Sequence, residues 1–359
     1  MPTPGSIPFS PSSVRCVVPK ENPYNSIYLQ AIAYLKALAT QIHFTPEVAS
    51  SRQAVLGRRR ALTLYHYGSF DIFASWLAYR GQSVFVFHNV TDATFFWRWS
   101  VLVAIRALAA SVQLSLFPKT VSWLTVSQFN CDVLRGKGFH DVTVVPCVIP
   151  PQICAAKTQH PSLLFIGRIA PNKNVLGLLD SYVQMASAWK GEPPSLLIVG
   201  ARKTRCRYAD AFEERYEAVR RVFPVIWRKD PLPYEDLQRL YASSWVYVSA
   251  SRHEGFAVPV MEAITAGTPA LYLSCGGTES VLKGIGCIQS PGSFAEHVKL
   301  HLVDRVKRTS LLEAQQTFAR EFTASKVGAA LVAALGSLAK TKALGIELPD
   351  VNKSIWLKS

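Results

Sequence analysis

Short apolar runs rich in Val, Leu and Ile alternate with segments of helical periodicity along this 359-residue chain, and the whole alternation occurs twice. Alternating strands and helices are typical of parallel βαβ units, and strands that are apolar throughout indicate a sheet covered on both faces. In the first half we expect strands near residues 14–18, 41–45, 62–66, 84–88, 124–127 and 142–146. The pattern predicts an α/β protein with one parallel sheet in each half.

The two halves are separated by residues 147–162, which contain three prolines and little periodicity, as expected of an interdomain linker. After it we expect strands near residues 163–167, 196–200, 225–227, 246–249 and 270–273. Helices should begin near residue 173 and cover 209–222, 234–242 and 259–266. We therefore expect domains over residues 1–155 and 156–330, followed by a C-terminal helix or tail over 331–359.

The net charge of +15 raises the question of nucleic-acid binding, so its distribution matters. Residues 1–155 hold 13 Lys and Arg against 6 Asp and Glu, and the remaining residues hold 26 against 18, so both halves are basic. No zinc-finger spacing or RNP-type aromatic pattern accompanies the charge, which argues against a nucleic-acid partner. Short basic clusters at residues 58–60 and 202–207 suit phosphates or anionic lipid as well as solvated loops.

Cysteine usage and the start of the chain indicate a cytoplasmic protein. The seven cysteines are scattered and never form a CxxC pair, which argues against a disulfide framework or a zinc site. Residues 1–13 have no apolar core and no early charge, so we expect no secretory signal.

The most hydrophobic run of the chain covers residues 95–117 and contains Arg98 and Arg106. A charge near the centre of a membrane span costs about 2.5–3.5 kcal/mol, which argues against a transmembrane helix. The tryptophans and basic flanks leave open an interfacial, membrane-contacting helix, but the sequence favours a buried core helix.

Two cations follow the first strand of the second half. That strand ends in Gly167-Arg168, and Lys173 follows five residues later at the expected start of a helix. Free N–H groups, the helix dipole and two positive charges at the carboxyl edge of a sheet form a site for a diphosphate. Solvent-facing charges on a loop would explain this fragment alone equally well.

A second constellation lies in residues 245–272, which read as strand, loop, helix, glycine stop and strand. Glu254 falls in the loop and Glu262 in the expected first turn of a helix that Pro259 opens. Glutamates near a helix start are often surface groups that compensate the dipole. Gly255, however, lets the backbone approach a ligand closely, and the turn offers successive N–H groups to an anion.

The second half resembles the family 4 retaining glycosyltransferases of the GT-B fold in three features. These are Gly167-Arg168 with Lys173, the HEGF sequence at residues 253–256, and the E-x7-E pair of Glu254 and Glu262. The resemblance extends over most of the chain. It implies two Rossmann-like domains facing across a cleft, with the tail crossing back to the first domain. It also implies roles for the second half: Arg168 and Lys173 hold the donor diphosphate, Glu254 contacts the transferred sugar, Glu262 binds the ribose, and N–H groups of Phe256, Ala257 and Val258 meet the sugar and phosphate.

The first half is similar to a bacterial branch of this family that builds polysaccharides, with one strand ending in His66-Tyr67-Gly68 and another in His88-Asn89. The resemblance places a histidine after the latter strand beside the sugar, which implies a catalytic role for His88. A histidine satisfied within the core is the alternative for both. Asn25, His66 and Asp92 are further acceptor-side candidates, although residues 22–25 replace a glycine-rich loop of many relatives.

The resemblance implies transfer of a mannose- or glucose-type hexose from a GDP- or UDP-sugar to a glycan or lipid-linked acceptor, with retained configuration. No D-x-D triplet occurs, so we expect no metal and no cofactor, the leaving-group charge being met by cations and helix N-termini. The departing phosphate should help deprotonate the acceptor, so Glu254 is not expected to be a covalent nucleophile.

The basic surface and the tryptophan-rich hydrophobic run favour an acceptor at the cytoplasmic face of the membrane, and hence a peripheral location there. Two alternative functions stay open: a nucleotide-sugar epimerase of related fold, and a catalytically silent partner in a polysaccharide-assembly complex.

Overall fold

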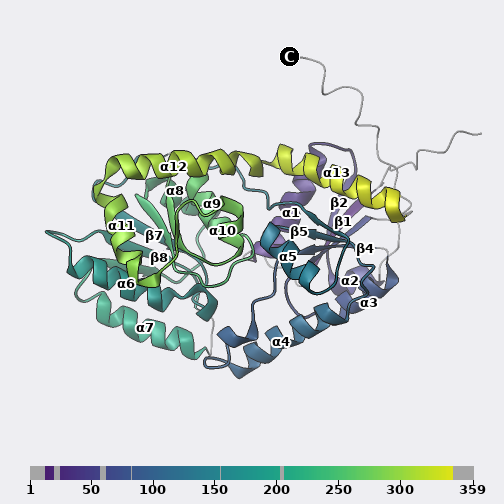
Figure 1. The fold of residues 1–359 in the computed structure, drawn as a ribbon, viewed down its shortest axis with the longest axis horizontal. Coiled ribbons are helices and arrows are strands. Elements are labelled where there is room, and N and C mark those ends of the chain that lie inside the picture. Colours follow the sequence, from purple (N-terminus) through teal and green to yellow (C-terminus); the bar gives the residue numbers. More distant parts are fainter. Residues whose placement is uncertain are drawn as a thin grey trace, which may run out of the picture.

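The computed structural model describes residues 13–19, 25–56, 62–81, 83–153, 155–202 and 206–342. They form two α/β domains that lie side by side, each built on a six-stranded sheet (Figure 1). Neighbouring strands are parallel in both sheets. The predicted fold class is confirmed.

The first sheet has the strand order β2-β1-β3-β4-β5-β6. Its strands are β1 (Ser13–Val18), β2 (Thr45–Ser50), β3 (Leu62–Tyr67), β4 (Ser83–Phe87), β5 (Trp123–Thr125) and β6 (Val142–Val144). Successive side chains point to opposite faces, so Leu64 packs into one core and Tyr65 into another. Both cores are apolar, which explains why the strands read as continuous hydrophobic runs.

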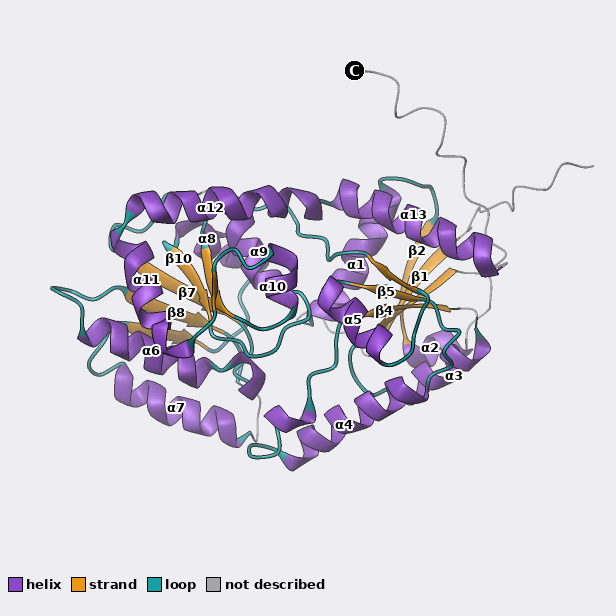
Figure 2. Ribbon diagram, viewed as in Figure 1, coloured by secondary structure: helices purple, strands orange, loops and turns teal. Residues whose placement is uncertain are grey.

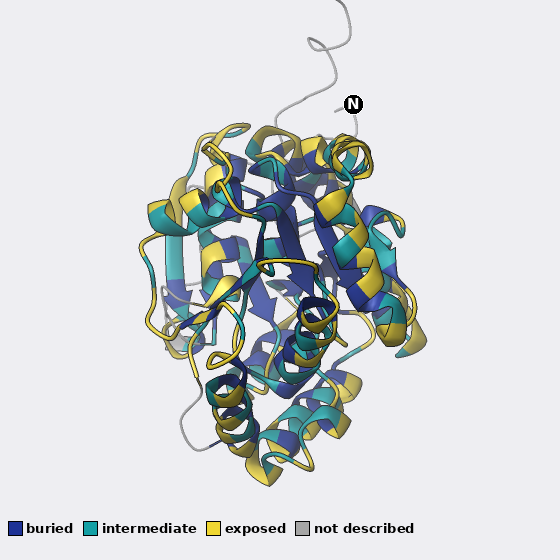
Figure 3. Cartoon of the chain, turned by 90° about the vertical axis from the view of Figure 1, so that its left-hand side faces the viewer, coloured by how far each residue is buried: buried dark blue, intermediate teal, exposed yellow. Residues whose placement is uncertain are grey.

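The second sheet repeats this plan with the order β12-β11-β10-β7-β8-β9. Its strands are β7 (Ser162–Ile166), β8 (Ser195–Val199), β9 (Val225–Arg228), β10 (Val246–Ser249), β11 (Ala270–Leu273) and β12 (Cys287–Ile288). Figure 3 views this domain and shows buried strands between helices whose outward faces are exposed.

Helices flank both sheets (Figure 2). Those of the first domain are α1 (Ser26–Ala39), α2 (Ser51–Leu56), α3 (Ile72–Arg80), η1 (Ala93–Phe95), α4 (Val101–Leu116) and α5 (Gln128–Gly136). Those that follow are η2 (Pro171–Lys173), α6 (Val175–Ser187), α7 (Arg207–Val219), α8 (Tyr234–Ser243), α9 (Val258–Thr265), α10 (Gly277–Leu282), η3 (Pro291–Ser293), α11 (Phe294–Val303), α12 (Arg305–Ala319), η4 (Arg320–Phe322) and α13 (Ala324–Lys342).

One predicted strand was wrong. Residues 41–45 were expected to form the second strand, whereas β2 begins at Thr45. The N–H groups of Gln41 and Ile42 donate to the carbonyl oxygen of Leu38, which extends the turn at the end of α1. The chain needs this turn to leave the helix before it can enter the sheet.

The chain crosses between the domains twice. The first crossing is the segment between β6 and β7, and the second leads from α12 into α13, which packs on α1 of the first domain. The second crossing lies at η4, earlier than the expected start at residue 331. A Cβ on Gly328 would lie 2.3 Å from the carbonyl oxygen of Ala37, so α13 approaches α1 closely because of this glycine.

The hydrophobic run of residues 95–117 does not form a core helix. It contains η1 and α4, and α4 is buried on one side only, through Ala104, Ala110, Gln113 and Leu114. The expectation of a core helix was therefore wrong, because six large aliphatic side chains of α4 are exposed. Within the described part of the chain, no helix is both long and apolar enough to cross a bilayer.

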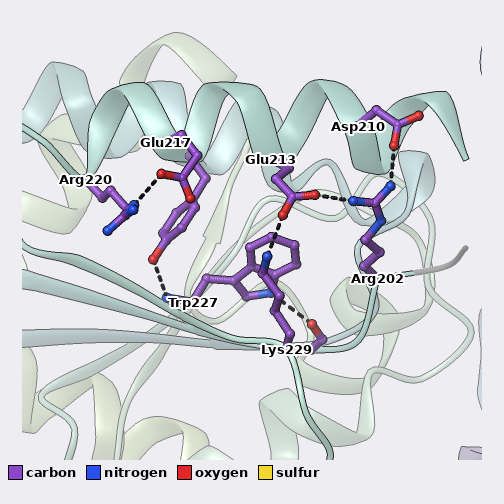
Figure 4. Close-up of polar contacts among 9 residues, drawn as sticks. Arg202, Asp210, Glu213, Glu217, Arg220, Trp227 and Lys229 are labelled. Atoms are coloured by element: carbon purple, nitrogen blue, oxygen red, sulfur yellow. Dashed lines mark hydrogen bonds and ion pairs between the residues drawn. The ribbon is translucent and has the colours of Figure 1, made fainter.

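The surface of α7, in the second domain, is charged, whereas the exposed face of α4 is aliphatic. Arg202 pairs with Asp210 and Glu213, and Glu213 also accepts from Lys229 at 2.5 Å (Figure 4). The Lys229 ammonium lies 4.5 Å from the centre of the Trp227 ring. The charges on this helix are thus largely paired within the domain.

Candidate functional site

The carboxyl ends of the strands of the second domain bring together three loops. Gly167-Arg168 follows β7, residues 250–257 follow β10, and residues 274–276 follow β11. Arg168 is exposed, and the N–H of Arg252 donates to the carbonyl oxygen of Asn172 at 2.8 Å. The loop after β10 is thus tied to η2, which carries Lys173.

Lys173 and Glu254 form an ion pair between these loops, with Nζ and Oε1 separated by 2.5 Å. Their side chains are only 16% and 12% exposed. Lys173 is the last residue of η2 and lies two residues before α6 begins at Val175, close to the expected helix start. Charges this close and shielded from water interact more strongly than they would in bulk solvent, both with each other and with a charged ligand beside them.

The backbone around Glu254 is fixed by the loop after β11. The N–H of Glu254 donates to the carbonyl oxygen of Cys275 at 3.3 Å, and the N–H of Gly277 donates to the carbonyl oxygen of Glu254 at 3.0 Å. A Cβ on Gly277 would lie 2.4 Å from that same oxygen. Glycine is therefore required for these two loops to run side by side.

The N-terminus of α9 lies beside the ion pair. Ala257 caps the helix with a positive φ of 65°, and Pro259 stands in the first turn. A small pocket next to it is lined by Lys173, Glu254 and Ala257 together with Ser249, Ser251 and Tyr247. A left-handed non-glycine residue is strained, and such strain is concentrated at functional sites. The helix N-terminus and Lys173 together favour an anion here.

Glu262 is the fifth residue of α9, which begins at Val258, one residue earlier than expected. Its carboxylate accepts hydrogen bonds from the hydroxyls of Tyr241 at 2.9 Å and Tyr234 at 3.4 Å. Burial raises the pKa of Glu262 to about 7, although the hydrogen bonds from the two tyrosines act in the opposite direction. Gln152, from the segment joining the domains, donates to the hydroxyl of Tyr234 at 2.8 Å.

These partners of Glu262 were not identified from the sequence. Tyr234 and Tyr241 are seven residues apart, so they share one face of the predicted helix over residues 234–242. That spacing was the available signal, but nothing local to it identifies Glu262 as the group that both tyrosines contact.

On the opposite side, His88 directly follows β4; it is half-buried and pairs with the fully buried His66 of β3. His66 Nδ1 and His88 Nε2 are 2.8 Å apart, and the two rings stack. Burial lowers the pKa of His88 to about 4. Burial also lowers the pKa of His66, and the neighbouring His88 lowers it further. Both rings are therefore neutral near pH 7, and one donates to the other.

The acceptor-side candidates have local roles in the structure. His66 is fully buried, and its partner is His88. Asn25 caps α1 by accepting from the N–H of Ile27 at 3.0 Å. Asp92 caps η1 by accepting from the N–H of Thr94 at 2.7 Å, and these hydrogen bonds to Thr94 lower its pKa. Both caps are exposed.

The HEGF loop contacts the first domain directly. Ser127 Oγ donates to the carbonyl oxygen of Gly255 at 2.7 Å. A Cβ on Gly255 would lie 2.7 Å from the carbonyl oxygen of His88, so glycine permits this approach. His253 lies between the rings of Phe95 and Phe129, at centroid distances of 5.8 and 6.3 Å, and burial lowers its pKa. The sequence did not identify this seam between the domains.

Comparison with known proteins shows what the second domain is similar to. Residues 160–304 match the family model described as "Glycosyl transferases group 1". The O-antigen chain mannosyltransferase B of Escherichia coli is 27% identical over 152 residues, which are 42% of this chain and 38% of that protein. The chain thus matches well under half the length of this curated relative.

Solved structures show the same fold over nearly the whole chain. Sucrose-phosphate synthase from Thermosynechococcus elongatus superposes with a TM-score of 0.71, covering 92% of this chain and 100% of that one at 13% identity. HepE of Anabaena, solved with UDP and glucose, gives a TM-score of 0.67 over 90% and 99% at 14% identity. The expected resemblance to the GT-B glycosyltransferases is confirmed, as is the two-domain architecture that it implied.

Proposed function

Because residues 160–304 carry the pattern of the group 1 glycosyltransferases and the two domains form a GT-B fold, we propose that the chain transfers a hexose from a nucleotide-diphosphate sugar to a glycan or lipid-linked acceptor. The observation that carries the proposal is the shielded Lys173–Glu254 pair at the N-terminus of α9. It combines a cation and a helix N-terminus, which favour an anion, with a carboxylate beside them.

The donor occupies the second domain. Arg168 and Lys173, with Gly167 allowing the approach, bind the diphosphate, and the N–H groups of residues 255–258 add the positive end of α9. Glu254 accepts from hydroxyls of the transferred sugar, and Glu262 accepts from the ribose. Charge that grows on the leaving diphosphate is met by these fixed groups, so the reaction needs no metal.

The neutral His88 faces the donor half from the first domain. Close contact between Gly255 and the carbonyl oxygen of His88 supports a position beside the sugar. In this proposal the acceptor hydroxyl attacks from the face that the diphosphate leaves, and a phosphate oxygen takes its proton. The C1–O bond to the diphosphate breaks, the new glycosidic bond forms on the same face, and the configuration is retained.

The donor is a GDP- or UDP-sugar. The matched relative is named a mannosyltransferase, which favours mannose, whereas the HepE structure contains UDP and glucose. We place GDP-mannose first and a UDP-hexose second.

Thermal unfolding with UDP, GDP, ADP and CMP, each with and without magnesium, tests the donor site. A ligand at 100 times its dissociation constant adds about 2.7 kcal/mol to the free energy of unfolding. We expect one nucleoside diphosphate to stabilise the wild type without magnesium and to fail on Arg168→Ala/Lys173→Ala. The control is Lys190→Ala/Arg221→Ala, two exposed cations of the same domain, which should respond as the wild type does.

The shift on adding ligand is compared within each variant, because Lys173→Ala also removes the partner of Glu254. If no nucleotide stabilises the folded wild type, the silent-partner alternative replaces the proposal. Product analysis by proton NMR then separates the remaining possibilities: a new glycoside with the anomeric configuration of the donor supports retaining transfer, and conversion of the nucleotide sugar without acceptor indicates an epimerase.

A further inference from the structure

The outward face of α4 is an almost continuous strip of aliphatic side chains. Six of them are 47% to 67% exposed: Val101, Leu102, Ile105, Leu108, Val112 and Leu116. Their spacing follows the helical repeat, so they form one stripe along the whole helix. Contiguous exposed apolar surface of this kind marks an interaction site.

The rotation of α4 about its axis is set by hydrogen bonds on its inner side. Gln113 is buried, and its amide donates to the carbonyl oxygen of Asp71 at 2.6 Å and to Ser75 Oγ at 2.9 Å. The hydroxyl of Tyr67 donates to the carbonyl oxygen of Ala110 at 2.7 Å. These bonds hold a polar residue inside and the aliphatic residues outside, which is the reverse of an ordinary surface helix.

The neighbouring helix α3 extends this surface. Ile72 and Tyr79 are each 69% exposed, and the hydroxyl of Tyr79 donates to the carbonyl oxygen of Leu116 at 3.1 Å. We call the six aliphatic residues of α4, with Ile72 and Tyr79, the α3–α4 surface. It lies along the edge of the molecule that α7 continues in the second domain (Figure 1).

The charged side chains of α4 and its flanking segments have one sign. No Asp or Glu occurs from Ala93 to Cys131, whereas Arg98, Arg106 and Lys119 lie within that stretch. At the same edge, the acidic side chains Asp210 and Glu213 of α7 are paired with cations from neighbouring segments of the second domain, Arg202 and Lys229 (Figure 4). Apolar side chains flanked by unbalanced cations match a bilayer with anionic headgroups, which takes up the former and attracts the latter.

We propose that the α3–α4 surface rests on an anionic lipid bilayer, with the axis of α4 parallel to the membrane plane. The proposal stands apart from the transfer reaction, since it uses none of the donor-site residues. A second copy of this chain fits less well. Two such surfaces facing each other would bring the cations Arg98, Arg106 and Lys119 of both copies together, and residues 93–131 contain no carboxylate to pair with them.

Co-sedimentation with vesicles tests the apolar part. The full chain is mixed with vesicles of phosphatidylcholine alone or with about one-third phosphatidylglycerol, and the partition coefficient is measured. Ile105→Gln/Leu108→Gln/Val112→Gln should lower partition into the anionic vesicles about 100-fold, from the lost burial of three half-exposed aliphatic side chains. The control is Val222→Gln/Val303→Gln/Val306→Gln, three exposed valines outside this surface, which should bind as the wild type does.

A second pair of variants tests the charges. Arg98→Gln/Arg106→Gln should lower partition into anionic vesicles roughly 10- to 30-fold at low salt, since each cation near such a surface contributes a several-fold effect. Lys190→Gln/Arg221→Gln, in the second domain, should have little effect.

Equal partition of the wild type and the Ile105, Leu108, Val112 variant would overturn the proposal, as would absence of wild-type binding to the anionic vesicles. A wild-type dimer in sedimentation velocity that the same triple substitution dissociates would also overturn it, in favour of self-association. Nucleotide-induced stabilisation of each variant, measured in parallel, shows that the fold and donor site are intact, so failure here is distinct from failure of the proposed transfer activity.

Discussion

The two sides of the candidate site are held by different kinds of interaction. On the donor side, an ion pair, backbone hydrogen bonds between loops and a helix N-terminus surround Glu254 within a single domain. On the other side, His88 is held by stacking and one hydrogen bond to a buried, neutral His66. In the proposed reaction, the first arrangement would meet a charged diphosphate, and the second would present a neutral group to the acceptor hydroxyl. Under that proposal, recognition of charge and positioning of the acceptor are divided between the domains.

Removing the carboxylate of Glu254 should have the largest effect on the rate of transfer. Glu254→Gln leaves Lys173 without its anion and weakens contacts to the sugar, so we expect kcat to fall about 1000-fold. Steady-state kinetics with the identified donor measures it. Glu296→Gln, an exposed glutamate on α11, is the control and should keep kcat within about twofold of the wild type. A small effect of Glu254→Gln would mean that the donor side does not depend on the pair.

Gly255→Ala breaks the contact between the two sides while leaving the donor side in place. Its Cβ would lie 2.7 Å from the carbonyl oxygen of His88, so the domains must separate locally. We expect transfer to fall about 100-fold, since small misplacement is costly in catalysis. Nucleotide binding, measured by calorimetry, should change little.

The matched control for this substitution is Gly136→Ala at the end of α5, where a Cβ meets nothing within 4 Å. If Gly255→Ala abolished nucleotide binding as well, the glycine would serve the donor loop and not the seam between the domains.

The raised pKa of Glu262 gives the donor side a dependence on pH. With a pKa of about 7, Glu262 is mostly protonated at pH 6 and mostly ionised at pH 8, so a carboxylate that accepts from the ribose binds it better at the higher pH. We expect nucleotide affinity to fall about 10-fold from pH 8 to pH 6. In Glu262→Gln this part of the dependence should vanish, leaving the titration of the nucleotide itself.

The same shift affects stability with the opposite sign. Glu262 binds a proton more tightly in the folded chain than in the unfolded one, so its contribution favours folding below about pH 4.5 and is lost as pH rises through about 7. Urea unfolding of the wild type and of Glu262→Gln across this range measures the difference.

The smallest effect is expected for His66. His66→Leu roughly keeps the side-chain volume but removes the hydrogen bond that positions His88. Loss of that hydrogen bond costs about 1 kcal/mol, which corresponds to a roughly fivefold lower kcat. His66→Gln can still hydrogen-bond and should recover part of the rate. Equal rates for both variants would assign His66 to packing alone.

The sequence predicted which loops of the second domain come together, but it did not predict how they meet the first domain, for a physical reason. Gly167, Lys173, Glu254 and Gly255 lie on short loops at the ends of parallel strands, so their order along the chain brings them to one edge of the sheet. The seam formed by Ser127, Phe95 and Phe129 depends on how two domains meet, and no local spacing encodes that contact.

The remaining misses have the same origin. Residues 41–45 are apolar enough for a strand, but the end of α1 takes them into a turn. α4 reads as a core helix because its composition is apolar, whereas hydrogen bonds from Gln113 and Tyr67 decide which side faces inward. Which face of such a helix is buried depends on contacts with residues that are distant in the sequence.

The two crossings between the domains touch each other: the N–H of Ile149 donates to the carbonyl oxygen of Phe322 at 2.8 Å. Two bodies joined at adjacent points can rotate about an axis near those points but cannot slide freely past one another. Figure 1 shows α12 and α13 on one side of the molecule and α4 with α7 on the opposite side. The lever arm is therefore longest at that far edge, where Trp99 packs edge-on against Tyr208. A small rotation about this axis would part these two rings most, so tryptophan fluorescence of a Tyr208→Leu variant against the wild type can report the opening angle.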